Sequence, residues 1–180
     1  MKKTTTQKIA ANSMLAAMCA VLGFVSIDMG NLKLTLESVP ILIGALLFGP
    51  ADGALIGFVG TFVYQLLRYG ISATTLLWIL PYVLCGLVVG LYSKRREFAL
   101  TLRQTIFIVL AAELMITLLN TGVMYIDSKI YGYYSFVYIF GTFFLRLAIC
   151  IGKAVAEGSL LPSLLTLLKK AIMPEQLTGE

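Results

Sequence analysis

The sequence of 180 residues contains no histidine, only three cysteines and only nine acidic residues. Without histidine or a close group of Cys, Asp and Glu, it lacks the usual ligand sets of a metal site. The cysteines lie at unrelated spacings in apolar segments, which indicates small core residues and no disulfide framework. No nucleotide-binding motif occurs, because Gly152-Lys153 lacks the residues that flank a phosphate-binding loop. We therefore predict a protein with no metal, no cofactor and no catalytic residues, which does not hydrolyse ATP.

Apolar residues dominate what is present, since 59% of the chain is hydrophobic and its mean hydropathy is +0.91. This composition is typical of an integral membrane protein. A helix needs about 20 mostly apolar residues to cross a bilayer, and polar interruptions divide the chain into separate apolar blocks. We predict an all-α membrane protein with a single domain over residues 1–180, built from six transmembrane helices. The predicted spans are residues 9–27, 38–48, 51–68, 75–93, 104–126 and 136–168.

The second block, residues 38–48, is too short to cross the membrane unaided. It ends at Phe48-Gly49-Pro50, where glycine stops one helix and proline opens the next. We expect a short second helix that either lies against longer neighbours or re-enters the membrane.

Basic residues predict the orientation of the spans, because cytoplasmic loops retain Lys and Arg. Nine of them flank the ends that we place inside, and three lie in the opposite loops. Both termini of this multi-pass protein are therefore predicted to be cytoplasmic. The net charge of +5 reflects this topology, so the partner it indicates is the lipid bilayer and not a nucleic acid. The inside set is Lys2, Lys3, Lys8, Lys94, Arg95, Arg96, Arg103, Lys169 and Lys170, and the outside set is Lys33, Arg68 and Lys129.

Four ionisable residues lie inside predicted spans, where a charge costs at least about 2.5 to 3.5 kcal/mol and normally has a partner or a function. Glu113 and Asn120 share one face of the fifth span. Lys153 and Glu157 are an i, i+4 pair in the sixth span. Because these spans run antiparallel, we predict that Glu113, Lys153 and Glu157 form a structural ion network. Arg146 falls near Asn120, toward the outside.

Two interpretations of these charges stay open. The ion network either locks the last two helices together, which we favour, or contacts a ligand directly. Arg146 either binds an anionic or amide-rich ligand through its guanidinium group or extends to the lipid headgroups.

The predicted outer loops are rich in aromatic and polar residues, which predicts an outward-facing pocket for a flat organic ligand. The alternative is a belt of aromatic side chains at the membrane interface. The candidate substrate-binding residues are Asp28, Asn31, Lys33, Arg68, Tyr69, Trp78, Asn120, Tyr125, Tyr131, Tyr134 and Arg146.

Small residues follow one face of the first span, at Asn12, Ala16 and Ala20. Residues of this kind let helix backbones approach closely. The stripe either packs inside the bundle or faces another subunit.

Three stretches carry a family resemblance: residues 34–50 (LTLESVPILIGALLFGP), the glycine-rich third span and residues 113–121 (ELMITLLNT). Together with Ala16-xxx-Ala20, they make the whole chain resemble the substrate-binding S components of energy-coupling-factor (ECF) vitamin transporters, in the folate-type group. The resemblance implies high-affinity vitamin binding and assembly with a transmembrane scaffold subunit and two ATP-binding subunits. It further implies that Ala16 and Ala20, with Asn12 on the same stripe, contact the scaffold, and that the S component topples in the membrane to deliver its vitamin.

Two departures from the folate-type pattern bear on the substrate. Folate-specific members typically carry an arginine late in the first span, where this chain has Gly23-Phe24-Val25. They also carry a Pro-Gly-Phe-Thr-like element before the fourth span, where this chain has Ala73-Thr74-Thr75-Leu76. These departures favour cobalamin, closely followed by folate, whose carboxylates would meet basic residues such as Arg68. Pantothenate and pyridoxine are further alternatives within the same family.

Two other classes of protein stay open. A solitary secondary transporter driven by protons or sodium would use Glu113 as its coupling carboxylate. A membrane scaffold without a ligand would show no saturable binding of any vitamin.

Overall fold

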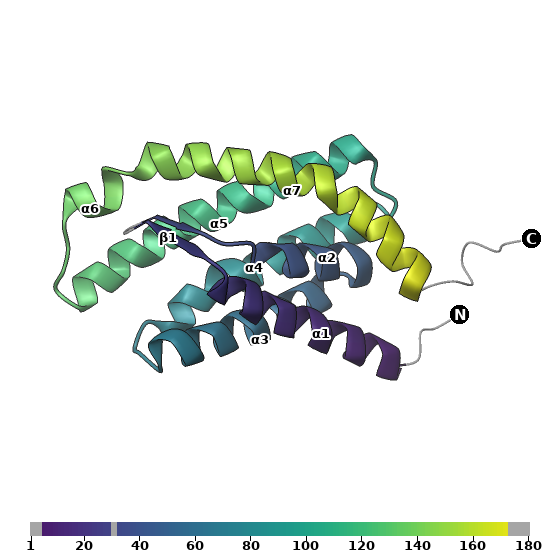
Figure 1. The fold of residues 1–180 in the computed structure, drawn as a ribbon, viewed down its shortest axis with the longest axis horizontal. Coiled ribbons are helices and arrows are strands. Elements are labelled where there is room, and N and C mark those ends of the chain that lie inside the picture. The colour runs from purple at the N-terminus through teal and green to yellow at the C-terminus, as the bar shows by residue number, and fades with distance from the viewer. Residues whose placement is uncertain (1–4, 30–31, 173–180) are drawn as a thin grey trace, which may run out of the picture.

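The computed structural model describes the backbone of residues 5–29 and 32–172, and the side chains of residues 6–27 and 35–168. The long helices lie side by side along the longest axis of the molecule (Figure 1). We call the end with the two chain termini the terminal end. The opposite end, with the β-hairpin and the connections 70–74 and 131–135, is the loop end. The elements are α1 Thr5–Phe24, β1 Ile27–Met29, β2 Leu32–Leu34, α2 Ser38–Phe48, α3 Pro50–Tyr69, α4 Thr75–Arg95, α5 Leu102–Ile130, α6 Phe136–Phe140 and α7 Phe143–Ile172.

Five segments of the described chain are long and apolar enough to cross a membrane, and α2 is the short exception. The predicted bounds of α2, residues 38–48, agree with the structure. With 11 residues at 1.5 Å each, α2 covers about half of a hydrocarbon core that is about 30 Å thick. It lies within the bundle against α1, α3, α4 and α7, with Ile41, Leu42 and Ala45 fully buried. The second predicted span is therefore a core helix that is too short to span the membrane by itself.

Glycines bring α3 and α4 into backbone contact. A Cβ atom on Gly86 would lie 2.3 Å from the carbonyl carbon of Gly53, which is closer than real Cβ atoms come. Since van der Waals contact is a main source of helix association in lipid, these glycines serve the packing of α3 against α4.

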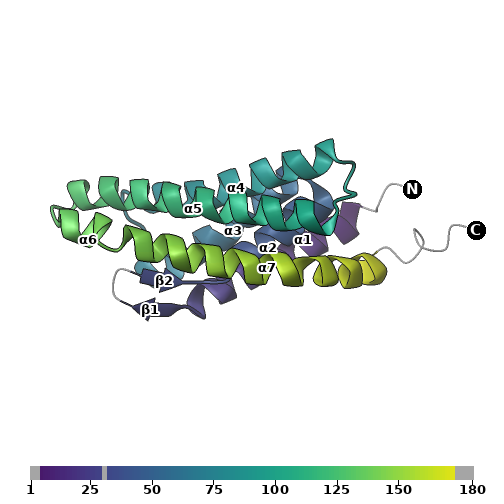
Figure 2. The ribbon, with the colours of Figure 1, turned by 90° about the horizontal axis from the view of Figure 1, so that it is seen from above.

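Two local features differ from the prediction. The expected loop between the first two helices contains an antiparallel hairpin, in which Asp28 pairs with Lys33. The last predicted span is divided into α6 and α7, because the helix is interrupted at Gly141 and Thr142. Glycine is a poor helix former, so a break at this point is physically reasonable. In the view from above, α5 and α7 run side by side, with α6 at the loop end (Figure 2).

Candidate functional site

A line of polar residues on α5 organises the candidate site. Glu113, Asn120 and Asp127 are seven residues apart, and two helical turns bring each back to the same face. α5 packs against α4 and α7. Each of the three residues belongs to one layer of polar contacts. We call these layers deep, middle and upper, in order from the interior of the bundle to the loop end. We call the three layers together the polar seam.

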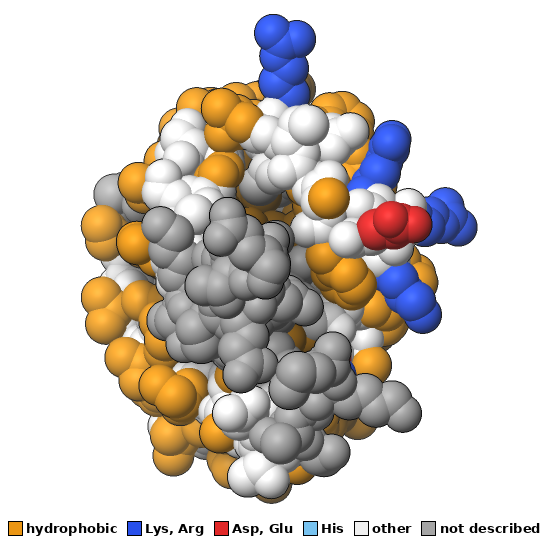
Figure 3. Space-filling model, turned by 90° about the vertical axis from the view of Figure 1, so that its right-hand side faces the viewer, with side chains coloured by type: hydrophobic (Ala, Val, Ile, Leu, Met, Phe, Trp, Pro, Cys, Tyr) orange, Lys and Arg blue, Asp and Glu red, His pale blue; other side chains and the backbone are white. Residues whose placement is uncertain are grey.

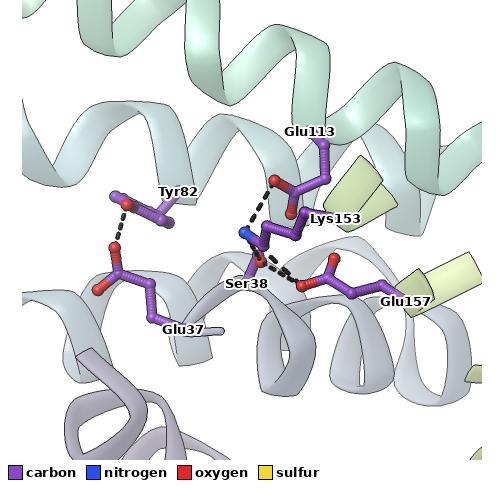
Figure 4. A network of polar contacts seen from close by, with 6 residues as sticks. All are labelled: Glu37, Ser38, Tyr82, Glu113, Lys153 and Glu157. Atoms are coloured by element: carbon purple, nitrogen blue, oxygen red, sulfur yellow. Dashed lines mark hydrogen bonds and ion pairs between the residues drawn. The ribbon is translucent and has the colours of Figure 1, made fainter. Parts of the chain in front are cut away.

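The deep layer is an ion network that joins three helices (Figure 4). The Lys153 Nζ atom lies 2.9 Å from Glu113 Oε2 and 3.6 Å from Glu157 Oε1. It also donates to Ser38 Oγ at 2.9 Å, and Ser38 donates to Glu157 Oε1 at 3.4 Å. The structure thus brings together the three charged residues that we grouped from the sequence. It adds Ser38, so the network holds α2 as well as α5 and α7.

The middle layer lies beside it and begins at Glu37, the residue before α2 (Figure 4). The Tyr82 hydroxyl of α4 donates a hydrogen bond to Glu37 Oε1, and the Asn120 side chain is a second partner of that hydroxyl. Glu37 is only 3% exposed. Its Oε2 atom and the Asn120 Oδ1 atom are buried and have no hydrogen-bond partner among the described residues. Buried acceptors without a partner are uncommon, so these two atoms call for an explanation.

Acids outnumber bases where the two layers meet. Glu37, Glu113 and Glu157 are each at most 4% exposed, and Lys153 is the basic residue among them. The second carboxylate oxygens of all three acids lack a partner among the described residues. Leaving such acceptors buried without a hydrogen bond costs about 1 to 3 kcal/mol each. Each of these acceptors can be satisfied by a hydrogen-bond donor or by protonation of a carboxyl group.

The upper layer is centred on Asp127, which is 8% exposed. Its Oδ1 atom accepts from Thr74 Oγ1 at 2.5 Å and from Trp78 Nε1 at 3.3 Å. Its Oδ2 atom accepts from the Tyr133 hydroxyl. Partial burial raises the pKa of Tyr133, and the hydrogen bond to Asp127 raises it further, so the phenol stays a donor. Asp127 thereby joins the end of α5, the start of α4 and the connection 131–135.

Two of the substrate-binding residues predicted from the sequence lie in the polar seam: Asn120 in the middle layer and Trp78 in the upper one. Three others cannot be placed. Asn31 lies outside the described residues, and the side chains of Asp28 and Lys33 do so as well.

The remaining predicted aromatic residues form exposed clusters at the loop end. The Tyr125 and Tyr134 rings meet edge to face at 5.6 Å, and Lys129 Nζ lies 3.8 Å from the centre of the Tyr134 ring. Tyr131 is 51% exposed.

At the end of α3, Arg68 lies 5.9 Å from the centre of the Tyr69 ring, and the Tyr69 hydroxyl accepts from Tyr64 at 3.4 Å. These contacts place Arg68 and Tyr69 beside each other at the loop end, and a ligand role for this pair stays a prediction.

Arg146 lies on α7 and is half-buried, and its Nη2 atom donates to Met124 Sδ at 3.0 Å. Met124 follows Asn120 by one helical turn of α5, so the predicted depth of Arg146 agrees with its position. A ligand role for Arg146 stays a prediction.

The small-residue stripe of α1 packs inside the bundle. Asn12, Ala16 and Ala20 are each 7% exposed, and Asn12 donates to Asp52 Oδ1 of α3 at 2.6 Å. A Cβ atom on Gly60 of α3 would lie 2.9 Å from the Ala16 carbonyl oxygen. Of the two interpretations of this stripe, packing is the one seen in the isolated chain, and contact with another subunit stays a prediction.

Sequence reasoning missed Glu37, Ser38, Tyr82 and Asp127 as members of the site. One signal was available, because Asp127 continues the spacing of seven from Glu113 and Asn120. Glu37 and Ser38 belong to the stretch 34–50, but their sequence position gives no indication of the helices that they contact.

A family model described as "ECF-type riboflavin transporter, S component" matches residues 3–167. The fold is similar to a crystal structure of FolT bound with folic acid, with a TM-score of 0.67 and 20% identity, covering 87% of this chain and 91% of that one. It is equally similar to the S component for biotin from an ECF-type ABC transporter, with a TM-score of 0.67 and 15% identity, covering 91% and 94%. These two likenesses establish the fold.

Two curated relatives, both UPF0397 proteins of Streptococcus thermophilus, are 29% identical over 99 residues. The match covers 54% of this chain and 54% of each relative, so the chain spans about half the length of the curated relatives it matches.

Proposed function

Because this chain belongs to the family of S components of ECF-type riboflavin transporters, we propose that it binds a vitamin at the loop end and delivers it for import. S components are the substrate-binding parts of transporters and are not enzymes. The chain carries no nucleotide-binding motif. The proposal therefore includes a transmembrane scaffold subunit and two ATP-binding subunits as partners, with delivery by toppling of the S component in the membrane.

The proposed orientation places the terminal end in the cytoplasm and the loop end outside. The exposed basic residues Lys94, Arg95, Arg96 and Arg103 surround the turn between α4 and α5 at the terminal end. The view of that end shows Lys and Arg side chains projecting from a largely apolar surface (Figure 3). Cytoplasmic loops retain such residues, so this distribution supports the orientation.

The observation that carries the proposal is the set of unpaired acceptors in the middle layer. Glu37 Oε2 and Asn120 Oδ1 come from different segments, and each residue uses its other side-chain polar atom on the Tyr82 hydroxyl. A buried polar group normally has a partner, so a pair without one marks a position for a ligand. The nearby Trp78 lies one turn above Tyr82 on α4 and offers an aromatic surface against which a flat ring can stack.

We propose a heterocyclic vitamin with ring N–H donors as the substrate, with riboflavin first. Its isoalloxazine ring is flat and carries an imide N–H, which matches a carboxylate acceptor beside an aromatic ring. A carboxylate of the ligand would be repelled by the acids of the deep layer, so it would have to face the loop end.

The preference for cobalamin, followed by folate, rested on two motifs that the sequence lacks, whereas the similar proteins named above concern riboflavin, folic acid and biotin. Cobalamin carries amide donors that suit the same acceptors, and the pterin of folate carries ring donors. Both vitamins therefore belong in the test.

The test is calorimetric titration of the purified full chain in detergent with riboflavin, folate, biotin and cobalamin. We expect saturable one-to-one binding of riboflavin, with weaker or no binding of the other three. Tighter binding of cobalamin or folate would overturn the substrate and keep the transporter class. A purified, folded chain that binds no vitamin would contradict the proposed function.

A further inference from the structure

We propose that Asp127 is a positioning residue of the vitamin site, which holds the indole ring of Trp78 in place and ties the connection 131–135 to the bundle. This inference rests on the proposed function, because it assigns a role in the same site. It concerns a residue that does not itself reach the middle layer. Asp127 acts through its neighbours.

The geometry of the upper layer supports this role. Three donors from three separate segments converge on one carboxylate: Thr74 from the connection before α4, Trp78 from the first turn of α4, and Tyr133 from the connection before α6. The three donors are uncharged, so Asp127 is stabilised by hydrogen bonds and not by an ion pair with any of them. Removing the carboxylate would release all three segments at once.

The hydrogen bond to Trp78 decides how its ring is presented. The side chain of Trp78 turns about two bonds, and a hydrogen bond from Nε1 to a buried carboxylate selects one orientation of the ring. Trp78 and Tyr82 are four residues apart and share a face of α4, which places the indole directly above the Tyr82–Glu37 contact. A ring that is held in this way can stack on a ligand without first losing its rotational freedom.

The hydrogen bond from Tyr133 has a different consequence. It crosses from the connection 131–135 back to α5, and the Tyr133 ring also meets Tyr138 of α6 edge to face at 6.2 Å. The connection is therefore tied to the polar seam by Tyr133, in addition to the ring contacts that Tyr134 makes with Tyr125 and Lys129 of α5. Loss of this bond would loosen the connection while leaving Trp78 in place, so it would change the rate of vitamin exchange more than the affinity.

The chain offers a direct test, because Trp78 is its single tryptophan. We expect Asp127→Ala to shift the emission of the ligand-free protein to longer wavelength and to lower its fluorescence anisotropy. We expect the same variant to weaken vitamin binding about tenfold, the equivalent of one hydrogen bond to a charged group. Asp127→Asn keeps one oxygen acceptor for Trp78 and should retain the emission of the wild type, which guards against a variant that fails to fold.

Tyr133→Phe separates the second role from the first. It should keep the emission of Trp78 and the affinity, and it should speed both binding and release of the vitamin in stopped-flow quenching of Trp78. The matched control is Tyr92→Phe, which removes a tyrosine hydroxyl at the terminal end of α4 and should change neither rate.

The outcomes separate this inference from the proposed function. If Asp127→Ala keeps the wild-type emission, anisotropy and vitamin affinity, the positioning role is wrong while the proposed function stands. A shifted emission with unchanged affinity would also overturn the role, because the ring position would then be irrelevant to the vitamin. If the wild-type chain binds no vitamin, the proposed function fails and this role fails with it, whatever the fluorescence of the variants.

Discussion

The two sides of this bundle are held together by different means. On one side, α3 has 44% of its most apolar stretch buried and meets α4 through glycines whose backbones touch. On the other side, the last span has only 17% of such a stretch buried, and α7 meets α2 and α5 through Lys153. In lipid, close packing is a main source of association between apolar helices, so a loosely packed helix depends more on polar contacts. The comparison indicates that α3 and α4 form a closely packed part of the bundle. Beside it, α5 and α7 are held in position by a few polar residues.

The largest effect on the free energy of unfolding should come from disrupting the ion network around Lys153. Lys153→Met would leave Glu113 and Glu157 buried without their cation, which costs about 3 to 5 kcal/mol when a buried pair is broken. Unfolding of the detergent-solubilised protein by heat or denaturant measures this loss. The control is the triple variant with Glu113→Gln and Glu157→Gln added, which removes the charges together and should recover most of the stability. A single variant as stable as the wild type would show that the network does not hold α7.

A smaller loss of stability should come from disturbing the contact between α3 and α4. Gly86→Ala places a methyl group against the backbone of α3 and should cost about 1 to 3 kcal/mol in the same unfolding measurement. Gly122 of α5 offers the matched control, because nothing lies within 4 Å of a Cβ atom built there. Gly122→Ala should leave stability unchanged or raise it by up to about 1 kcal/mol through helix propensity. Equal effects of the two alanines would contradict the distinction between the two sides.

The smallest effect should come from Ser38→Ala, because Lys153 keeps both of its carboxylates when the serine hydroxyl is lost. We expect a loss of about 1 kcal/mol, typical of one hydrogen bond. Combined with Lys153→Met, the serine variant should add little, since both act on one network. Full additivity of the two losses would argue that Ser38 stabilises α2 independently of the network.

Helical spacing predicted part of this architecture from the sequence. Gly49 and Pro50 predicted the C-terminal end of α2. The contact of Glu113 with Lys153 was predicted because two antiparallel helices carry polar residues at matching depth. Such inferences succeed because a charge inside a membrane requires a partner, and few partners exist in an apolar chain.

The orientation of α1 was not predictable in the same way. Its buried face carries Ala16 and Ala20, while Met14 and Val21 are 68% and 60% exposed. Because lipid is as apolar as a protein core, hydrophobicity does not distinguish the inward face of a membrane helix from the outward one. Small residues mark a contact face without saying whether the neighbour belongs to the same chain.

The middle layer could not be predicted from the sequence, for a different reason. Glu37 lies in a connection outside every predicted span, so its burial depends on α2 being drawn into the bundle. The contact between Glu37 and Tyr82 joins residues 45 positions apart on non-adjacent segments. Periodicity within one helix carries no information about such a pair.

The most direct test of the account is the affinity of the Glu37→Gln variant for riboflavin, compared with the wild type and with Glu97→Gln. The glutamine keeps an oxygen for Tyr82 but replaces the unpaired acceptor with an N–H donor, and Glu97 is an exposed acid at the terminal end. We predict a loss of about tenfold to a hundredfold for Glu37→Gln and no change for Glu97→Gln. Wild-type affinity in a correctly folded Glu37→Gln protein would contradict the claim that the polar seam receives the vitamin.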